Sequence, residues 1–230
     1  MGKYQDSGDT EQEGHKFTKR EFLIDGERVL LEPLDEARLP SDYEIVQGVF
    51  KDNHIYLPKT IDSEELHSKN YFGREKEETY QLNLFESLIL ITRNRIAVQD
   101  HETSQVLGFD ALVEKGAQEN PRFWIQYLVY RDLRARGFVV RAGFGNRMDF
   151  RVYPRGTQQN THAAKYFIIV LEEAEEMPLN LLETMAQQAL SNRKTLLLAL
   201  VDSLGDVTYY SCSTFNLDPL TKKNDFFDEK

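Results

Sequence analysis

Residues 127–156 read YLVYRDLRARGFVVRAGFGNRMDFRVYPRG, and this stretch decides the fold of the second half of the chain. Its first part places apolar side chains at helical spacing and ends at Gly137, as a helix with a glycine cap does. FVVRA and MDFRVY then read as two consecutive strands across the loop GFGN. The stretch therefore predicts a helix followed by a strand hairpin in one packed unit.

The sequence on both sides of this stretch extends the unit. Asn120 can cap a helix and Pro121 fits the first helical position, so we expect the helix to begin there. AAKYFIIVLEE predicts a third, centrally buried strand, and Pro178 begins a second helix. KTLLLALVD and DVTYYSCS predict a hairpin across the turn Ser203-Leu204-Gly205. Helix, strands, helix and hairpin in this order describe a mixed sheet flanked by helices.

The first half of the chain predicts a smaller mixed α/β unit. EFLIDGERVLLE, residues 21–32, surrounds Asp25-Gly26, a dipeptide that suits a tight hairpin turn. EIVQGVF and HIYLP are short strand candidates. QLNLFESLILITRN, residues 81–94, repeats apolar side chains at helical spacing. Residues 95–98 follow as a short strand, and GFDALVEKGA, residues 108–117, as a helix.

The whole chain is thus expected to have an α/β (α+β) fold in four segments: a disordered leader at 1–18, an N-terminal domain at 19–117, a C-terminal domain at 118–217 and a tail at 218–230. The leader is polar and lacks the apolar core of a signal peptide. No run approaches the roughly 18 apolar residues that cross a bilayer. Cys212 is the single cysteine, so neither an internal disulfide nor a cysteine metal cluster can form. These features predict a soluble, cytoplasmic protein.

The formal net charge of −10 argues at first against a nucleic-acid partner, because binding a polyanion relies on Lys and Arg. Nearly all of the negative excess, however, lies in residues 1–120. The segment 122–155 has only Asp132 and Asp149 as acids, and its arginines are Arg122, Arg131, Arg134, Arg136, Arg141, Arg147, Arg151 and Arg155. Arginine grips phosphate at two points. This segment is therefore either a phosphate-binding surface or a helix face with structural ion pairs.

Three residues stand where catalytic side chains could lie. Tyr153 ends the second strand of the hairpin, just before Pro154. His162 stands at the entry to the buried third strand, beside a turn rich in Gly, Thr, Gln and Asn. Lys194 begins the first strand of the last hairpin. Taken singly, each is more often a packing or exposed residue than a catalytic one.

Together, these residues lie in motifs that resemble the archaeal tRNA-splicing endonucleases. YRDLRARGF, DFRVYPRG, HAAKYFIIVLEE and SNRKTLLLALVDSLGDVTYY look like the catalytic domain of that family, in order and nearly in spacing. FLIDGERVLLE and FESLILI look like its N-terminal domain, so the resemblance covers most of residues 20–215. The stretch around residues 35–65 and the polar leader depart from the family pattern.

The resemblance implies that residues 118–217 are a catalytic nuclease domain that excises introns from precursor tRNA at bulge-helix-bulge-like sites. The family's catalytic residues fall on Tyr153, His162 and Lys194. Cleavage of RNA by its own 2′-hydroxyl needs a base, an acid and a cation for the charge that gathers at phosphorus. The three residues would take these roles in that order, without a metal or cofactor. The expected products carry 2′,3′-cyclic phosphate and 5′-hydroxyl ends.

Precursor tRNA is therefore the expected partner. The residues expected to contact RNA are five arginines, Arg134, Arg136, Arg151, Arg155 and Arg193. Positive charge from Arg151, Arg155 or Lys194 would also favour the ionised form of the tyrosine that acts as base. Gln187 stands where relatives have an arginine that clamps a bulge base, so that clamp is altered or supplied by another residue.

The turn that contains Asp202 and Asp206 resembles the acidic loop that family members insert into a basic pocket of another subunit. The residues alone fit an ordinary polar turn equally well. A chain with one catalytic unit needs at least two copies to cut both intron boundaries. We therefore expect a homotetramer, or pairing with a separate structural subunit as a dimer of heterodimers.

Two other functions stay open from the residues. Asp149 on one strand and Lys165 on the next suggest a metal-dependent DNA nuclease of the restriction or junction-resolving type. The acid expected two residues before the lysine is Ala163, which leaves the oxygen ligands for magnesium incomplete. A non-catalytic RNA-binding subunit of a splicing endonuclease would share the fold, but it would not need the three catalytic residues to coincide.

Overall fold

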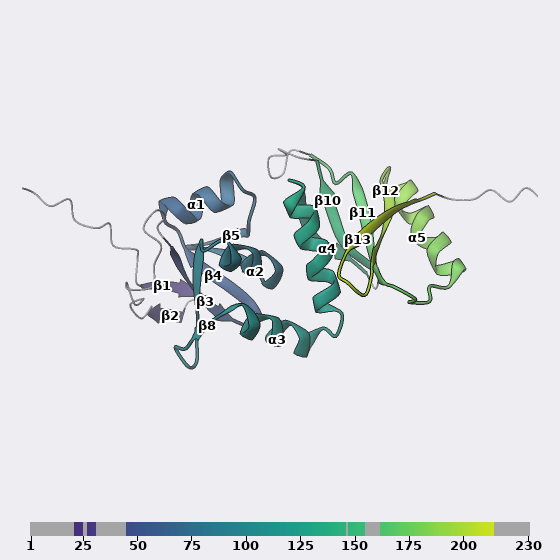
Figure 1. The fold of residues 1–230 in the computed structure, drawn as a ribbon. Coiled ribbons are helices and arrows are strands. Elements are labelled where there is room, and N and C mark those ends of the chain that lie inside the picture. Colours follow the sequence, from purple (N-terminus) through teal and green to yellow (C-terminus); the bar gives the residue numbers. More distant parts are fainter. Residues whose placement is uncertain (1–20, 25–26, 31–44, 146, 155–161, 214–230) are drawn as a thin grey trace, which may run out of the picture. The chain divides into compact units, whose positions relative to one another are not determined.

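The computed structural model describes residues 21–24, 27–30, 45–145, 147–154 and 162–213 (Figure 1). The chain divides into two units, residues 1–109 and 110–230. The predicted leader at 1–18 and the predicted tail at 218–230 lie outside the described residues. Both units combine helices with a mixed sheet, which confirms the predicted α/β (α+β) class.

The N-terminal unit begins with the predicted hairpin, in which β1 and β2 pair antiparallel. A six-stranded sheet follows, with the strand order β5-β6-β4-β3-β7-β8. Its core includes Ile55, Leu57, Leu82, Leu88 and Val98, all almost fully buried. The elements are β1 (Glu21–Ile24), β2 (Glu27–Leu30), β3 (Val46–Lys51), β4 (His54–Pro58), α1 (Ile61–Ser68), β5 (Arg74–Lys76), β6 (Thr79–Asn83), α2 (Leu84–Thr92), β7 (Ile96–Asp100) and β8 (Val106–Leu107).

The helix predicted at residues 81–94 is shorter than its apolar spacing suggested. Residues 81–83 belong to β6, and α2 begins at Leu84. Asn83 ends the strand because its side chain accepts from the backbone N–H of Glu86, while the Glu86 carboxylate accepts from the backbone N–H of Asn83. This reciprocal capping box satisfies two N–H groups that the first helical turn would otherwise leave unpaired.

The C-terminal unit is built around a five-stranded sheet with one helix on each face. Its strand order is β13-β12-β11-β10-β9, so β11 lies in the centre as the sequence predicted. The pair β11–β12 is parallel and the other pairs are antiparallel. Figure 1 shows α4 on one face of this sheet and α5 on the other. The elements are α3 (Phe109–Glu119), α4 (Phe123–Ala135), β9 (Val139–Phe144), β10 (Met148–Tyr153), β11 (Tyr166–Glu172), α5 (Leu179–Ser191), β12 (Thr195–Val201) and β13 (Val207–Cys212).

Helix α4 begins later than the sequence predicted, at Phe123 rather than Pro121. The Asn120 side chain accepts from the N–H of Arg122, and the N–H of Phe123 donates to the Asn120 carbonyl. These bonds close a tight turn ahead of the helix, a local alternative that asparagine side chains readily form. Asn120 therefore precedes a turn instead of capping α4 directly.

The β9–β10 hairpin depends on Gly143. A Cβ atom at this position would lie 1.7 Å from the carbonyl oxygen of Met148, so only glycine permits the approach of the two strands. On the other side of β10, the ladder with β11 runs from Phe150 to Val152. Beyond it, the Asp149 carboxylate accepts from the N–H of Val170, so a side chain satisfies this backbone donor of β11.

Candidate functional site

Three neighbouring strands begin or end at one end of the C-terminal sheet, and the three predicted catalytic residues lie on these strands or in the segments that lead into them. Tyr153 is the last residue of β10, Lys194 directly precedes β12, and His162 precedes β11. Tyr166 of β11 is in register with Val152 on one side and Thr195 on the other. Because hydrogen-bonded strands lie about 4.8 Å apart, this register brings the backbones of Tyr153 and Lys194 to the same end of the sheet.

The Tyr153 side chain is held by packing. It is half-buried and lies against the core cluster between the sheet and α5, which includes Phe167, Ala189 and Leu196. Pro154 follows at the end of the strand, where the missing N–H of proline costs no ladder bond. The ring is therefore fixed on its apolar side by a well-packed core.

A tight turn at the C-terminus of α5 sets the position of Lys194. The N–H of Arg193 donates to the Leu190 carbonyl at 2.8 Å, and the N–H of Lys194 donates to the Ala189 carbonyl at 2.9 Å. These two bonds form a Schellman motif, whose left-handed residue is usually glycine. Here that residue is Arg193, with a φ angle of +57°. A side chain in this conformation costs about 1–2 kcal/mol, a strain that often marks functional positions.

His162 lies in an exposed bend ahead of β11. Between it and the strand, Ala164 is buried in the core cluster on the α5 side of the sheet, and Lys165 bonds to both neighbouring strands. These two residues fix the path of the chain just after His162. The histidine therefore combines an exposed imidazole with a backbone that leads directly into the central strand.

Several of the arginines form structural ion pairs. Arg122 and Arg147 both pair with Glu175, and Arg122 also donates to the Val170 carbonyl. Arg136 pairs with Asp132 one helical turn earlier on α4. Arg122 and Arg147 thus have the structural role of the two that the sequence left open, whereas the exposed pair of Arg136 leaves its RNA contact a prediction.

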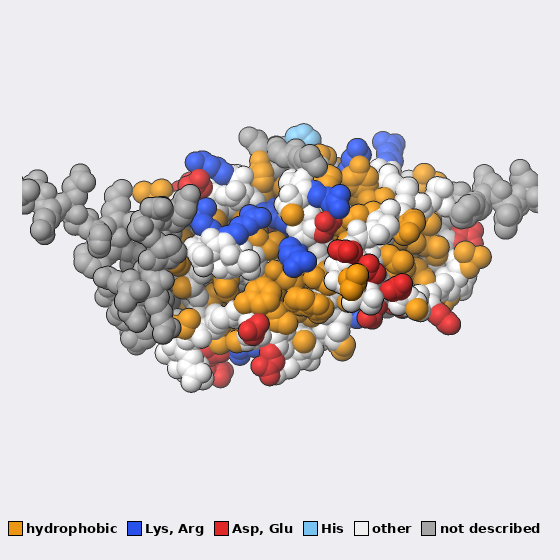
Figure 2. Space-filling view, in the orientation of Figure 1, with side chains coloured by type: hydrophobic (Ala, Val, Ile, Leu, Met, Phe, Trp, Pro, Cys, Tyr) orange, Lys and Arg blue, Asp and Glu red, His pale blue; other side chains and the backbone are white. Residues whose placement is uncertain are grey.

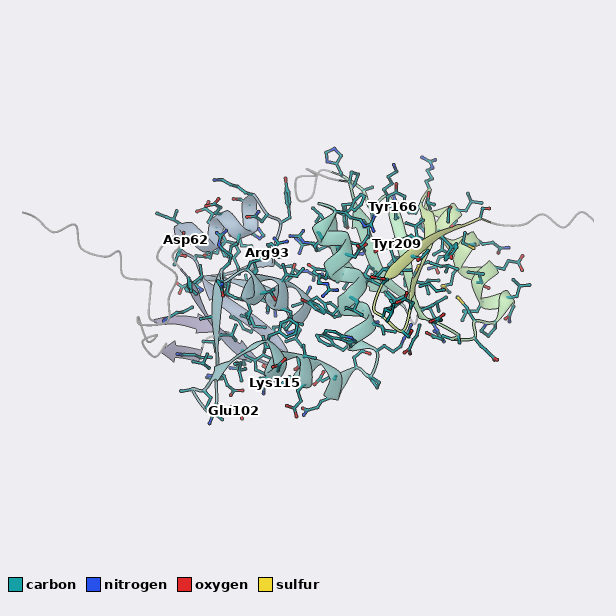
Figure 3. All side chains as sticks on the ribbon, in the orientation of Figure 1. Asp62, Arg93, Glu102, Lys115, Tyr166 and Tyr209 are labelled. Atoms are coloured by element: carbon teal, nitrogen blue, oxygen red, sulfur yellow. The ribbon has the colours of Figure 1, made fainter. Side chains whose placement is uncertain are left out.

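Arg136 also takes part in fastening the edge strand β13 to α4. The hydroxyl of Tyr209 donates to the Asp132 carboxylate at 2.8 Å, and the Arg136 guanidinium lies over the Tyr209 ring (Figure 3). Burial, followed by this hydrogen bond, raises the pKa of Tyr209. The phenol therefore stays protonated and acts as a donor in the packing of β13.

The other arginines predicted to contact RNA are placed differently. Arg134 donates to the Phe138 carbonyl and Arg151 to the Ala142 carbonyl. Arg193 lies beside Lys194 in the turn after α5. Arg155 lies outside the described residues.

Cations without an acidic partner gather at the end of the sheet where Tyr153 lies. Within the residues that the structure describes, no ion pair involves Lys165, Arg193 or Lys194. Figure 2 shows Lys and Arg side chains at this end of the C-terminal unit, near the top of the view. From the sequence, Lys165 was considered only as part of a metal site. Its place between β10 and β12 could not be predicted, because it depends on strand register. An anionic group at this end of the sheet would meet unneutralised positive charge.

Asp149, the acid of the alternative metal site, has a structural role. Its carboxylate accepts from the Gln126 side chain at 2.6 Å and from the N–H of Val170 at 2.7 Å. Burial raises the pKa of this carboxyl, although both hydrogen bonds oppose the shift. Both of its oxygens are therefore used in joining α4, β10 and β11. In the described part of the chain, no three His, Cys, Asp or Glu side chains are arranged to hold a metal ion.

The acidic turn between β12 and β13 is closed by its own hydrogen bonds. The Asp202 carboxylate accepts from the N–H groups of Leu204 and Asp206, both at 2.9 Å. Leu204 at its tip is 87% exposed. The turn is thus a preformed projection. Gln187 is exposed on α5, where its amide donates to Glu183.

Comparisons with known proteins match both units. Residues 123–209 match the family model for the tRNA intron endonuclease, catalytic C-terminal domain, and residues 46–113 match the model for its N-terminal domain. None of the helices that the structure describes is long and apolar enough to cross a membrane.

Similar proteins are tRNA-splicing endonucleases of archaea. The one from Methanococcoides burtonii is 40% identical over 162 residues, which are 70% of this chain and 44% of that protein. The one from Methanothermobacter thermautotrophicus is 33% identical over 168 residues, 72% of this chain and 95% of that protein. The one from Pyrococcus furiosus is 30% identical over 72% of this chain and 94% of that protein. The chain thus spans less than half the length of some relatives and nearly all of others.

Proposed function

We propose that this chain, which belongs to the tRNA intron endonuclease family, excises introns from precursor tRNA at bulge-helix-bulge-like sites. The observation that supports this most is the common end of β10, β11 and β12, because Tyr153 ends β10, Lys194 directly precedes β12 and the chain from His162 leads into β11. Lys165, Arg193 and Lys194, which form no ion pair within the described part of the chain, add to it, because the substrate is a polyanion. In this proposal residues 118–217 form the catalytic domain and residues 19–117 the N-terminal domain.

The proposed reaction is an attack by the RNA on its own backbone. Tyr153, as base, removes the proton from the 2′-hydroxyl, and the 2′-oxygen then bonds to the adjacent phosphorus. His162, as imidazolium, gives a proton to the 5′-oxygen as the bond between that oxygen and phosphorus breaks. Lys194 stabilises the negative charge on the pentacoordinate phosphorane. The products are a 2′,3′-cyclic phosphate and a 5′-hydroxyl, and no metal ion or cofactor takes part.

The local structure suits this division of labour. A base and a clamp act best when their own positions are fixed, and Tyr153 is held by packing and Lys194 by the turn after α5. An acid that gives its proton to a leaving group must regain one from solvent, and His162 is exposed. Each acid or base role is typically worth about 10²–10⁴-fold in rate.

Contacts to RNA outside the three catalytic residues would come from the arginines that the sequence predicted, which are Arg134, Arg136, Arg151, Arg155 and Arg193. Arg151 and Arg193 support this most, because neither forms an ion pair within the described residues. Arg136 can serve both the packing of β13 and an RNA contact, because its pair with Asp132 uses only two of the five N–H donors of the guanidinium.

The partners in this proposal are precursor tRNA and further copies of the chain. The turn with Asp202 and Asp206 would dock into a basic pocket of a neighbouring subunit, within a homotetramer or a dimer of heterodimers. Its internal hydrogen bonds support this role, because a preformed projection loses little conformational entropy on docking. The proposed location is the cytoplasm.

One experiment tests the reaction. The purified protein is incubated with an intron-containing precursor tRNA in excess EDTA, the product ends are identified, and light scattering gives the assembly size. His162→Ala and Lys194→Ala should each cut at least about 100-fold more slowly while precursor binding persists. His54→Ala is the matched control, because His54 lies in the N-terminal unit, where its imidazole hydrogen-bonds to the Asp52 carbonyl.

The same experiment separates the alternatives. Cleavage that stops in EDTA and returns with magnesium would favour the metal-dependent nuclease. Tight binding without cleavage by the wild-type chain would favour a non-catalytic RNA-binding subunit. Full-speed cleavage by His162→Ala would overturn the assignment of the acid.

A further inference from the structure

We propose that Lys165, held by the ring of Tyr166, binds a second RNA phosphate next to the one that is cut. This inference rests on the proposed function for the identity of the anion, an RNA backbone. It adds to that function a residue that positions the RNA strand in the site. Three features of the structure carry it: the backbone position of Lys165, its lack of an acidic partner, and its contact with an aromatic ring.

The backbone of Lys165 links the two strands that carry the proposed base and clamp. Its N–H donates to the carbonyl of Val152, the residue before Tyr153. Its carbonyl accepts from the N–H of Thr195, the residue after Lys194. Lys165 therefore lies between the proposed base and the proposed clamp, at the spacing of adjacent strands, which is about 4.8 Å.

The ammonium group of Lys165 is positioned without being neutralised. It lies 5.2 Å from the centre of the Tyr166 ring, and that ring is packed edge-to-face against Phe138. Figure 3 labels Tyr166. A cation above an aromatic face is attracted to the ring but keeps its N–H donors. Within the described residues, Lys165 has no carboxylate partner, unlike Lys59 and Lys69, which pair with glutamates.

This arrangement suits a phosphate better than a structural role. An exposed lysine that serves stability usually pairs with an acid or extends freely into water, whereas this one is oriented and left charged. Lys194 can neutralise one phosphate only, and the RNA chain on either side of the cleaved bond brings further negative charge into the site. Lys165 is the described cation whose backbone bonds directly to both flanking strands, so it would meet the neighbouring phosphate.

The test measures how RNA binding depends on salt. Binding uses a precursor tRNA with a 2′-deoxy nucleotide at each cut position, so that no cleavage can occur. Each lost phosphate contact lowers the slope of log affinity against log salt concentration by about 0.7–0.9. Lys165→Gln should show this decrease and a roughly threefold to tenfold weaker affinity. With the cleavable tRNA its KM should rise by more than its kcat falls.

Three further variants separate charge from structure. Lys165→Arg should restore the slope, because it keeps the charge. Tyr166→Leu should weaken binding while it keeps the wild-type slope, because the cation remains but is no longer oriented. Lys69→Gln removes an exposed lysine of the N-terminal unit that is paired with Glu65 and should change neither quantity. Thermal unfolding of each variant establishes that it is folded.

The outcomes distinguish this inference from the proposed function. If the wild-type chain cuts the precursor but Lys165→Gln keeps the wild-type slope, the phosphate contact of Lys165 is refuted and the proposed reaction stands. If the wild-type chain binds but does not cut, while Lys165→Gln lowers the slope, the contact stands and the proposed reaction is refuted. A lowered slope in Lys69→Gln as well would refute the contact, because any exposed lysine would then act in the same way.

Discussion

Replacing Arg193 by glycine should stabilise the protein while it weakens RNA binding. Arg193 has a φ angle of +57°, and its Schellman turn positions Lys194. Glycine adopts this conformation without steric cost, so the variant relieves about 1–2 kcal/mol of strain. Glycine also raises the conformational entropy of the unfolded chain, which lowers the free energy of unfolding by about 0.5–1 kcal/mol. The net stabilisation should be about 0.5–1 kcal/mol.

The matched control is Arg193→Ala, which removes the same guanidinium but keeps the left-handed strain. Both variants retain the two backbone hydrogen bonds of the turn, because these use only main-chain atoms. Thermal unfolding followed by circular dichroism measures the transition of the unit that contains α5. A gain of 1 kcal/mol corresponds to about 4–8 °C for a unit of this size, so Arg193→Gly should unfold about 2–8 °C above Arg193→Ala.

RNA binding by the same two variants gives an independent reading. If Arg193 contacts a phosphate, both variants should lose affinity equally, since both lack the guanidinium. The reasoning about strain is refuted if Arg193→Gly and Arg193→Ala unfold at the same temperature. The proposed RNA contact is refuted if both bind as the wild-type chain does.

Three other predictions follow from contacts in the C-terminal unit. Tyr209→Phe should lower the free energy of unfolding by about 1.5 kcal/mol in urea denaturation, because the hydrogen bond to the Asp132 carboxylate is lost; a loss under about 0.5 kcal/mol would contradict this. Gly143→Ala should cost at least about 3 kcal/mol or prevent folding, because its Cβ would overlap the Met148 carbonyl, which no rotamer change can relieve; wild-type stability would contradict it. Burial raises the pKa of Asp149, so its ionised form is disfavoured in the folded state and this residue should make stability fall as pH rises above about 4. Asp149→Asn should lose this part of the pH dependence of stability. If the free energies of unfolding of variant and wild type change in parallel between about pH 4 and 7, the pKa of Asp149 is not raised.

The arginine segment illustrates what residue types alone leave open. Phosphate contacts and structural ion pairs use the same side chain, and only the position of the acids decides between them. Glu175, distant in sequence from Arg122 and Arg147, pairs with both of them. Asp132 is close to Arg136 at helical spacing, so that pair could have been anticipated from the sequence.

The sequence by itself determined the order of the elements in the C-terminal unit, because local signals there are strong. Gly137 ends α4, Pro178 precedes α5, and a polar turn separates β12 from β13. The element boundaries predicted from the sequence were wrong where local hydrogen bonds compete with the hydrophobic periodicity. At Asn120 an additional turn delays α4, and at Asn83 a capping box ends β6 inside a segment that has helical spacing throughout.

Only the tertiary structure decided which residues share the end of the sheet. Tyr153, Lys165 and Lys194 are separated in sequence, and their neighbourhood follows from the register of β10, β11 and β12. Register depends on side-chain packing between strands and helices that are distant in the chain, so no local pattern encodes it. The motifs in the sequence indicated a tyrosine, a histidine and a lysine with related roles. The sheet brought the backbones of Tyr153 and Lys194 to the same end, with Lys165 between them.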